Sequence, residues 1–270
     1  MNNVMVFGRG FIGTRLKELN DWYFAEGRIG SVEDIVTQIE KHHPEAIVNA
    51  IGFAGRNNVD ECNDEMTETI YRNSYLPLLF MEAAMQTRTK LVHLGTGCMF
   101  TDSEQLRTEE DVPNYTGLLN SRTKAYADLA INNFAEEAHA LNIRFRVPID
   151  SRPHTRNLLD KLRRFDHVTS EPNSVTWVPD LAAGINHLLD NDKTGTYNIA
   201  VTKPIDYPTL LSFMNEYEGL FPDIVPGIEE ERTKVRMDVS KIQESGYNPM
   251  TPDELFTKGV DEYYQTLEAD

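Results

Sequence analysis

The chain has 270 residues, enough for one sizeable hydrophobic core or for a core with a small additional lobe. Hydrophobic residues make up 40% of the sequence, and no apolar run reaches the roughly 18 residues that a membrane-spanning helix requires. Acidic residues outnumber basic residues by 43 to 26, and this excess of negative charge makes nucleic acid an unfavourable partner. The composition therefore predicts a soluble globular protein and excludes membrane-spanning and nucleic-acid-binding classes.

The cysteine content indicates the compartment. Cys62 and Cys98 are too few for a disulfide framework, and no secretory apolar region precedes the first glycines, so we expect a cytoplasmic protein. The seven histidines and two cysteines lack metal-ligand spacing, so no metal site is predicted. An anionic small ligand stays possible if basic residues gather locally; the candidates are Arg9, Arg56, Arg152, Arg156, Lys161, Arg163 and Arg164.

In the first half of the chain, short apolar segments alternate with helical patterns. Strands are expected at 4–7, 22–24, 46–50, 90–94 and 144–147. Helices are expected after the first glycines to residue 19, from a capping box at Ser31 and Asp34 to just before Pro44, over 66–85 with a disturbance near Pro77, and over 118–141. This alternation predicts βαβ units in the α/β class, with a Rossmann-type doubly wound parallel sheet covered by helices on both faces.

The pattern changes after Pro148. Helical pieces near 156–164 and 180–189, a strand at 195–200 and a short helix between Asp238 and Gly246 are separated by loops. A terminal helix is expected to begin with Thr251 as its N-cap, Pro252 at its first helical position and Glu254 at its third. We therefore expect a dinucleotide-binding domain over 1–150 and a mainly substrate-binding lobe over 151–270, interleaved with the last sheet strands.

A glycine-rich turn joins the first strand to the first helix. Gly8, Gly10 and Gly13 form G-x-G-x-x-G, in which glycine lets the backbone turn tightly and approach a pyrophosphate at the helix N-terminus. No clear acid ends the second strand, because Glu26 lies in an ambiguous turn. Arg9 could pair with a ribose 2′-phosphate, which favours NADP(H), although a solvated loop arginine is the alternative. The expected cofactor-binding residues are Gly8, Arg9, Gly10, Phe11, Ile12, Gly13, Asn49, Ala50 and Lys124.

With these elements in place, the chain resembles the extended short-chain dehydrogenases that complete nucleotide-rhamnose synthesis. It is similar to the plant-type 3,5-epimerase/4-reductase acting on UDP-4-keto-6-deoxyglucose and, more distantly, to dTDP-4-dehydrorhamnose reductase. The likeness runs from the glycine loop to about Tyr217, and the family's glycine loop is commonly one residue longer. It is carried by Gly95-Thr96-Gly97-Cys98, Lys124, Gly55-Arg56-Asn57-Asn58-Val59-Asp60, Arg146-Val147-Pro148-Ile149, Arg156-Asn157, Lys161, Pro172-Asn173-Ser174 and Thr194-Gly195-Thr196-Tyr197-Asn198.

The resemblance implies a catalytic set. Thr96 matches the residue that hydrogen-bonds the sugar C4 carbonyl, and Lys124 matches the lysine that holds the nicotinamide ribose. Cys98 and Lys161 match residues thought to move protons at C3 and C5, where the 4-keto group acidifies the C–H bonds. The alternatives are a small buried hydrophobe for Cys98 and a solvated face or a diphosphate contact for Lys161. Expected substrate contacts are Arg56, Asn58, Asn73, Asn157 and Asn173.

One position departs from the family pattern. The family reads Tyr-x-x-x-Lys, whereas the residue four before Lys124 is Asn120. A carboxamide can hydrogen-bond an oxygen but cannot release a proton near neutral pH, and losing a general acid typically costs about 10²–10⁴-fold in rate. A water held by Asn120 and Thr96, Lys124 itself, or Tyr115 could supply the proton, whereas Tyr126 is expected to face away.

Three functions are consistent with this sequence. The first is a complete NADPH-dependent epimerase/reductase that makes a nucleotide-L-rhamnose-type sugar from a nucleotide-4-keto-6-deoxyglucose. The second is a 3,5-epimerase with little or no reductase activity, because Asn120 replaces the tyrosine. The third is a non-catalytic NADP-binding regulatory or interaction subunit. Retention of Thr96, Cys98 and Lys124 favours the two enzymes, with a nucleotide sugar as ligand and a homodimer as a possible assembly.

Overall fold

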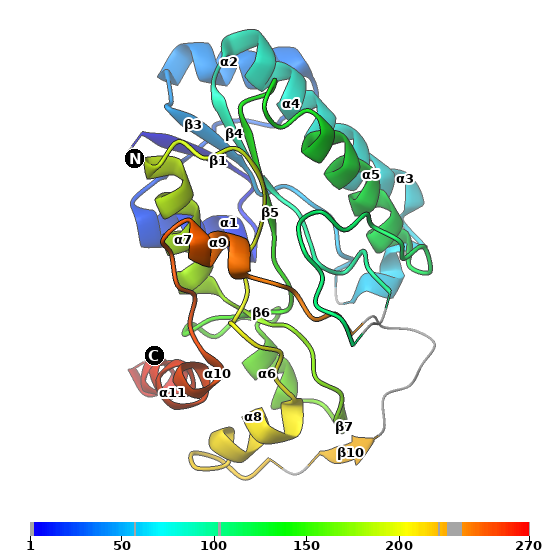
Figure 1. The fold of residues 1–270 in the computed structure, drawn as a ribbon, viewed down its shortest axis with the longest axis vertical. Coiled ribbons are helices and arrows are strands. Elements are labelled where there is room, and N and C mark those ends of the chain that lie inside the picture. The colour runs from blue at the N-terminus through cyan, green and yellow to red at the C-terminus, as the bar shows by residue number, and fades with distance from the viewer. Residues whose placement is uncertain (1–2, 57, 102–103, 221, 226–233, 270) are drawn as a thin grey trace.

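A parallel sheet forms the centre of the molecule in the computed structural model (Figure 1). The structure describes residues 3–56, 58–101, 104–220, 222–225 and 234–269. Six strands lie in the order β2-β1-β3-β4-β5-β9, and all of their pairings are parallel. The strands are β1 (Val4–Phe7), β2 (Tyr23–Phe24), β3 (Ala46–Asn49), β4 (Lys90–Leu94), β5 (Ala140–Arg144) and β9 (Gly195–Asn198). The predicted α/β class and doubly wound parallel sheet are confirmed.

Helices cover both faces of this sheet. One face packs against α1 (Phe11–Asn20), α7 (Val178–Asp190) and α9 (Ser240–Glu244), whose apolar side chains join one core cluster with β1, β3, β4 and β5. The other face packs against α2 (Val32–His42), α4 (Leu76–Thr87) and α5 (Leu119–Asn133) in a second cluster. The strands between them are almost completely buried, which explains their continuous apolar runs in the sequence. No helix among the described residues is long and apolar enough to cross a membrane.

Local capping chemistry agrees with the predicted helix starts. Ser31 and Asp34 form the expected capping box at the start of α2. Thr251 and Glu254 form another at α10 (Pro252–Glu254), which continues through a π-helical turn, Leu255–Gly259, into α11 (Val260–Ala269). The helix predicted over 66–85 is α3 (Met66–Ile70), a π-helical turn at Tyr71–Tyr75 and α4. The disturbance therefore lies in the turn just before Pro77, a residue that cannot donate a backbone N–H to that turn.

Two predicted boundaries are wrong. The helix expected over 118–141 ends at Asn133, and the strand expected over 144–147 is β5, Ala140–Arg144. The sequence near Ala138 favours helix locally, but pairing of β5 between β4 and β9 buries Leu141 and Ile143 in the sheet. Tertiary burial overrides local helix propensity in this segment.

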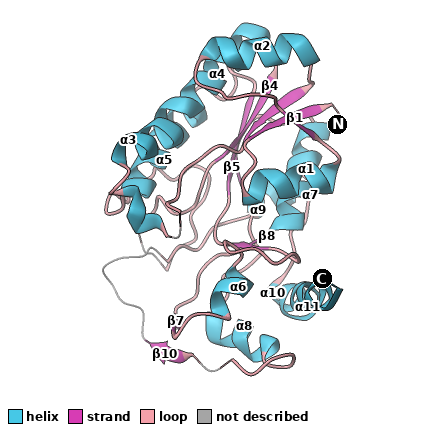
Figure 2. Cartoon of the chain, turned by 180° about the vertical axis from the view of Figure 1, so that it is seen from behind, coloured by secondary structure: helices cyan, strands magenta, loops and turns pink. Residues whose placement is uncertain are grey.

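A smaller lobe follows the sheet and has its own apolar cluster (Figure 2). Its elements are β6 (Pro148–Ile149), α6 (Leu158–Leu162), β7 (His167–Thr169), β8 (Thr176–Trp177), α8 (Tyr207–Met214), β10 (Asp223–Val225), α10 and α11. The pairs β6–β8 and β7–β10 are two-stranded parallel ribbons. Because β9, α7 and α9 belong to the main sheet layer, the chain crosses between sheet and lobe more than once.

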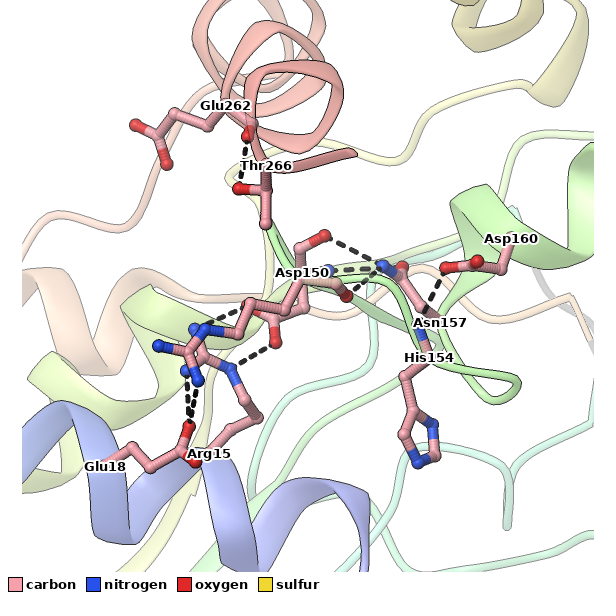
Figure 3. A network of polar contacts seen from close by, with 9 residues as sticks. Arg15, Glu18, Asp150, His154, Asn157, Asp160, Glu262 and Thr266 are labelled. Carbon is pink, nitrogen blue, oxygen red and sulfur yellow. Dashed lines mark hydrogen bonds and ion pairs between the residues drawn. The ribbon is translucent and has the colours of Figure 1, made fainter. Parts of the chain in front are cut away.

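A buried ion pair joins the first helix to this lobe (Figure 3). Arg15 of α1 donates from Nε and Nη2 to the two carboxylate oxygens of Asp150, at 2.5 and 3.1 Å, and also contacts Glu18. Arg152 contacts the same Glu18 carboxylate at 2.8 Å. Asn157 caps α6 and binds the Asp150 backbone in both directions, so its carboxamide fixes this connection. The lobe is therefore anchored next to the N-terminal half of α1.

Candidate active site

The glycine turn lies at the carboxyl ends of β1 and β3, where the strand order reverses. Gly8 has a φ of 108°, and a Cβ built on it would lie 2.7 Å from the carbonyl oxygen of Ala50. A Cβ on Gly13 would collide with the carbonyl oxygen of Gly8, whereas one on Gly10 would enter open space. Gly10 is the N-cap of α1, so the free N–H groups of the first helical turn point toward this space. The cradle fits a pyrophosphate group at a topological switch point.

Two alanine substitutions separate folding from binding at this cradle. Gly13→Ala should lower the thermal midpoint, because the new methyl group meets the Gly8 backbone. Gly10→Ala should keep the midpoint, since its φ of −79° and ψ of −177° suit alanine, yet weaken NADPH binding by about tenfold or more. Differential scanning fluorimetry and NADPH fluorescence titration check both variants. Unchanged affinity in the Gly10→Ala protein would contradict a pyrophosphate at this turn.

Arg9 lies in the glycine turn, and its side chain extends to the end of β2. Its guanidinium carbon is 5.0 Å from the ring centroid of Phe24, and Nη2 donates to the Ala25 carbonyl at 3.3 Å. Glu26, the acid of the ambiguous turn, instead pairs with Lys41 at 2.6 Å. Thus an arginine, rather than an unpaired acid, stands at the end of β2.

The Thr-Gly-Cys segment turns directly after β4. The Cys98 N–H donates to Thr96 Oγ1 at 3.1 Å, which leaves the hydroxyl hydrogen of Thr96 available for another acceptor. The Gly97 N–H donates to the Phe145 carbonyl beyond β5 at 2.9 Å. Met237 covers this turn, since a Cβ on Gly97 would lie 2.7 Å from its sulfur. Thr96 is buried and Cys98 is half-buried.

Lys124 reaches the same place from α5. Its Nζ would be 3.7 Å from a Cβ at Gly52, and the nearby Asn73 Oδ1 would be 3.5 Å from that position. Desolvation by the surrounding protein lowers the pKa of Lys124, the charge of Arg156 lowers it further, and the cysteines Cys98 and Cys62 oppose these effects. The structure therefore brings Lys124 near Cys98 in the turn after β4, and near Gly52 in the loop that follows β3.

His93 of β4 lies close to Lys124 and was not predicted from the sequence to belong to the site. It is 6% exposed in β4, and its Nδ1 lies 3.3 Å from Nδ2 of Asn49. Burial, together with the positive charge of Lys124, lowers the pKa of His93 to about 3. This imidazole is neutral at physiological pH and accepts a hydrogen bond from Asn49. The Asn49 Oδ1 accepts from the Ile51 N–H, so the whole carboxamide shapes the end of β3.

His93 should make the fold sensitive to acid. Below pH 6.5 the unfolded chain protonates this histidine, whereas the folded chain does not until about pH 3. Above pH 6.5 His93 is neutral in both states and does not reduce the free energy of unfolding. As the pH falls below 6.5, this free energy decreases by about 1.4 kcal/mol per pH unit. His93→Gln should remove this contribution, and His167→Gln, at an exposed position, serves as the control. Urea unfolding from pH 7 to pH 4 measures the slope; equal slopes in wild type and His93→Gln would contradict the assignment.

Asn120 is turned into the protein. Its Nδ2 donates to the Phe53 carbonyl at 2.7 Å and lies 3.8 Å from the sulfur of Cys62. Asn73 binds the same backbone unit, donating to the Phe53 carbonyl and accepting from the Phe53 N–H, both at 2.8 Å. The carboxamide that stands in the tyrosine position therefore fixes the loop after β3.

The alternative tyrosines lie at different places. Tyr126 is 64% exposed on α5, which confirms that it faces away from the site. Tyr115 folds back over its own loop, because its hydroxyl would lie 2.6 Å from a Cβ at Gly117. Lys124, another predicted proton donor, lies close enough to Cys98 for their charges to interact.

Most of the expected substrate contacts have polar partners within the chain. Asn58 caps a short 3-10 helix, Val59–Cys62, and Arg56 pairs with Glu65 at 2.8 Å. Asn157 is fully buried in the hydrogen bonds that cap α6. Asn173 Oδ1 accepts hydrogen bonds from Arg146 and from the Val235 N–H. Lys161 lies on α6, where its positive charge is one of the causes that lower the pKa of His154. Asn57 lies outside the described residues.

The basic residues do not form one free patch among the described residues, since several are paired with acids. Arg56 pairs with Glu65, Arg152 with Glu18 and Arg163 with Glu218. Arg156 is different: its Nη2 donates to the Gly55 carbonyl at 2.5 Å and connects the lobe to the loop after β3. Arg156 and Arg146 belong to the motifs that carried the resemblance; the sequence predicted Arg156 only as a member of a possible basic patch and predicted no role for Arg146.

Known proteins share both this sequence pattern and this fold. Residues 3–161 match the NAD dependent epimerase/dehydratase family. The chain belongs to this family. A bifunctional dTDP-4-dehydrorhamnose 3,5-epimerase/dTDP-4-dehydrorhamnose reductase of Arabidopsis thaliana is 29% identical over 229 residues, which are 80% of this chain and 75% of that protein. A trifunctional UDP-glucose 4,6-dehydratase/UDP-4-keto-6-deoxy-D-glucose 3,5-epimerase/UDP-4-keto-L-rhamnose-reductase of the same plant is 26% identical over 227 residues, and the match spans 34% of its length.

Solved structures of other proteins have the same architecture. The UDP-rhamnose synthase of Acanthamoeba polyphaga mimivirus superposes with a TM-score of 0.88 at 21% identity, covering 96% of this chain and 98% of that one. The dTDP-4-dehydrorhamnose reductase of Bacillus anthracis, in complex with NADP, superposes with a TM-score of 0.81 at 17% identity, covering 98% and 99%. At these identities the superpositions establish the fold.

Proposed function

We propose that the chain is a nucleotide-sugar epimerase/reductase that converts a nucleotide-linked 4-keto-6-deoxyglucose into a nucleotide-L-rhamnose with NADP(H). One observation carries this proposal: Thr96, Cys98 and Lys124 meet beside the glycine cradle of a family member. The relatives named for rhamnose synthesis support it, and they favour it over an epimerase without reductase activity and over a non-catalytic NADP-binding subunit.

The residues divide the chemistry between them. Bound NADPH would supply the hydride that reduces the sugar at C4. Gly8, Gly10 and Gly13 with the N-terminus of α1 hold its pyrophosphate, and Arg9 favours the 2′-phosphate form. Thr96 donates its free hydroxyl hydrogen to the C4 oxygen.

Proton transfer needs two further groups. In the epimerase step, Cys98 removes a proton from a carbon next to the C4 carbonyl, and the resemblance assigns the opposite face to Lys161. In the reductase step, we assign the proton donated to the C4 oxygen to Lys124, whose pKa is lowered by burial. The carboxamide of Asn120 donates to the Phe53 carbonyl, so we assign it a structural role in the loop after β3.

The test uses isotope exchange. The purified protein is incubated with UDP-4-keto-6-deoxyglucose, and separately with the dTDP analogue, in D₂O with and without NADPH. Deuterium at C3 and C5 by NMR and mass spectrometry, with consumption of NADPH, is the expected result. Exchange without NADPH consumption would reduce the function to an epimerase. Absence of both with either nucleotide would contradict the proposal.

We also propose a cytoplasmic homodimer. Both cysteines are free, which suits a reducing compartment. Met66 and Ile70 of α3 and Tyr126 of α5 expose 51%, 44% and 64% of their surface on neighbouring helices, which favours a partner on this face. Light scattering after size exclusion measures the assembly, and a monomer at micromolar concentration would contradict it.

A further inference from the structure

A histidine of the lobe stacks on the first residue of α1. The imidazole of His154 lies parallel to the ring of Phe11, with the ring centroids 4.4 Å apart and an interplanar angle of 6°. Phe11 directly follows Gly10, the N-cap of α1, and its side chain is buried. The imidazole also points away from the hydrogen bonds that Asp150 and Asn157 exchange (Figure 3). The stack therefore places a polar ring of the lobe beside the helix N-terminus that forms the cradle.

The segment that carries His154 is attached to the sheet layer at two points. Before the histidine, Asp150 pairs with Arg15 of α1. After it, Arg156 donates from Nη2 to the Gly55 carbonyl, in the loop that follows β3, at 2.5 Å. Helix α1 follows β1, and β1 and β3 are paired neighbours in the sheet. The segment therefore crosses the carboxyl edge of these two strands, with His154 between its two attachments.

A backbone hydrogen bond fixes the tautomer of His154. Its Nδ1 accepts from the Arg156 N–H at 3.0 Å, and since a backbone N–H can only donate, this nitrogen carries no hydrogen. Burial lowers the pKa of His154 and the charge of Arg156 lowers it further, whereas Asp160 and Asp150 oppose these effects, so the ring is neutral near pH 7. The hydrogen of the neutral ring is therefore on Nε2. Among the residues that the structure describes, none accepts this hydrogen.

The charges around His154 suit an anionic ligand. Arg156 is close enough to lower the pKa of the histidine, and its guanidinium donates to backbone carbonyl oxygens, which carry no formal charge. Asp150 is matched by Arg15 at 2.5 Å, and Asp160 accepts the His154 backbone N–H at 3.0 Å. The free N–H groups in the first turn of α1 add the positive end of a helix dipole. An imidazole N–H, a guanidinium and a helix N-terminus are thus close neighbours.

We infer that His154 is a further cofactor-binding residue, whose Nε2–H donates to the pyrophosphate of the dinucleotide held by the glycine turn. The inference rests on the proposed function for the identity of this ligand. The stack on Phe11 orders the imidazole before the cofactor binds, which reduces the entropy that binding must cost. Because His154 belongs to the lobe, the pyrophosphate contacts both parts of the chain and fastens the lobe to α1.

The test measures NADPH binding without any sugar. His154→Phe keeps a flat ring on Phe11 but has no N–H group, so the dissociation constant of NADPH should rise about tenfold, as expected for the loss of a hydrogen bond to a charged oxygen. His154→Gln, which keeps an N–H donor, should fall between wild type and His154→Phe. His167→Phe, at an exposed position of the same lobe, is the matched control and should bind NADPH like wild type. NADPH fluorescence titration measures the dissociation constants, and differential scanning fluorimetry shows that each variant is folded.

Further ligands identify the phosphate that His154 contacts. Adenosine 2′-monophosphate represents the adenosine end of NADPH without its pyrophosphate, whereas UDP and dTDP carry the diphosphate of the proposed sugar nucleotides. His154→Phe should bind all three as wild type does, as measured by isothermal titration calorimetry. If it binds UDP or dTDP about tenfold more weakly while its affinity for NADPH is unchanged, His154 contacts the sugar nucleotide, and the inference is overturned.

Phe11→Leu is a second variant in case His154→Phe does not fold. Leucine keeps an apolar side chain at the start of α1 but offers no flat ring to the imidazole, so the dissociation constant of NADPH should rise about threefold. Wild-type affinity for NADPH in both His154→Phe and Phe11→Leu would overturn the inference. That result is distinct from failure of the proposed function, because the wild-type protein would still bind NADPH and convert the sugar. A wild-type protein that does not bind NADPH would contradict both.

Discussion

Asn120→Tyr should raise the rate of NADPH consumption by about 10²-fold or more. A phenol at this position lies one helical turn before Lys124, whose ammonium favours its ionised form, so it can release the proton that a carboxamide cannot. The substitution removes the hydrogen bond from Asn120 to the Phe53 carbonyl, worth about 1 kcal/mol, but Asn73 still binds that carbonyl. Steady-state absorbance of NADPH with saturating 4-keto sugar measures the effect.

Asn120→Phe is the matched control for this change. It introduces the same ring without the hydroxyl and loses the same hydrogen bond to the loop. The tyrosine variant should exceed the phenylalanine variant in NADPH consumption, whereas the two should exchange deuterium at C3 and C5 at similar rates. Equal NADPH consumption in both variants would show that the missing tyrosine does not limit the reductase step.

Much of the fold was predictable because its signals are local. Short strands such as Ala46–Asn49 are buried on both faces and are therefore apolar except for Asn49, and the caps at Ser31 and Thr251 have side chains that satisfy the first backbone N–H groups. The segment around Ala140 was misassigned because its helix-favouring residues are drawn into the sheet by β4 and β9, which are distant in sequence. Long-range pairing leaves no trace in the local pattern.

The site was predictable where a backbone motif positions it. Gly8, Gly10 and Gly13 follow from the approach of a phosphate, whereas Thr96 and Cys98 were implied by the resemblance to a family, which their place after a strand of a parallel sheet supports. The inward turn of Asn120 was not predictable, because it depends on the carbonyl of Phe53, 67 residues earlier in the chain. The sequence showed only that asparagine stands at position 120, where the family pattern has tyrosine.

The contacts of Arg146 with Cys98 and Asn173 required the structure for the same reason. A charged residue two positions after a buried strand is a signal that sequence reasoning could have used, since such a side chain must find a polar partner. Its partners, however, come from segments 48 residues before it and 27 residues after it. The chemical setting of Cys98 is thus made by tertiary structure, although the cysteine itself is visible in a short motif.

Lys124→Met should lower NADPH consumption by about 10²-fold or more, because it removes both the ribose contact and the proposed proton donor. Since burial lowers the pKa of Lys124, the wild-type rate should be highest while the ammonium is intact and should fall as the pH rises through a value below 10.5. Lys124→Arg keeps a charge that does not titrate in this range, so its lower rate should lack the alkaline fall. The pH dependence of kcat for NADPH consumption compares the three proteins, with Lys258→Met as the exposed control. If kcat still falls at alkaline pH in Lys124→Arg, another group donates the proton. Asn120→Tyr would then show whether a phenol can donate it.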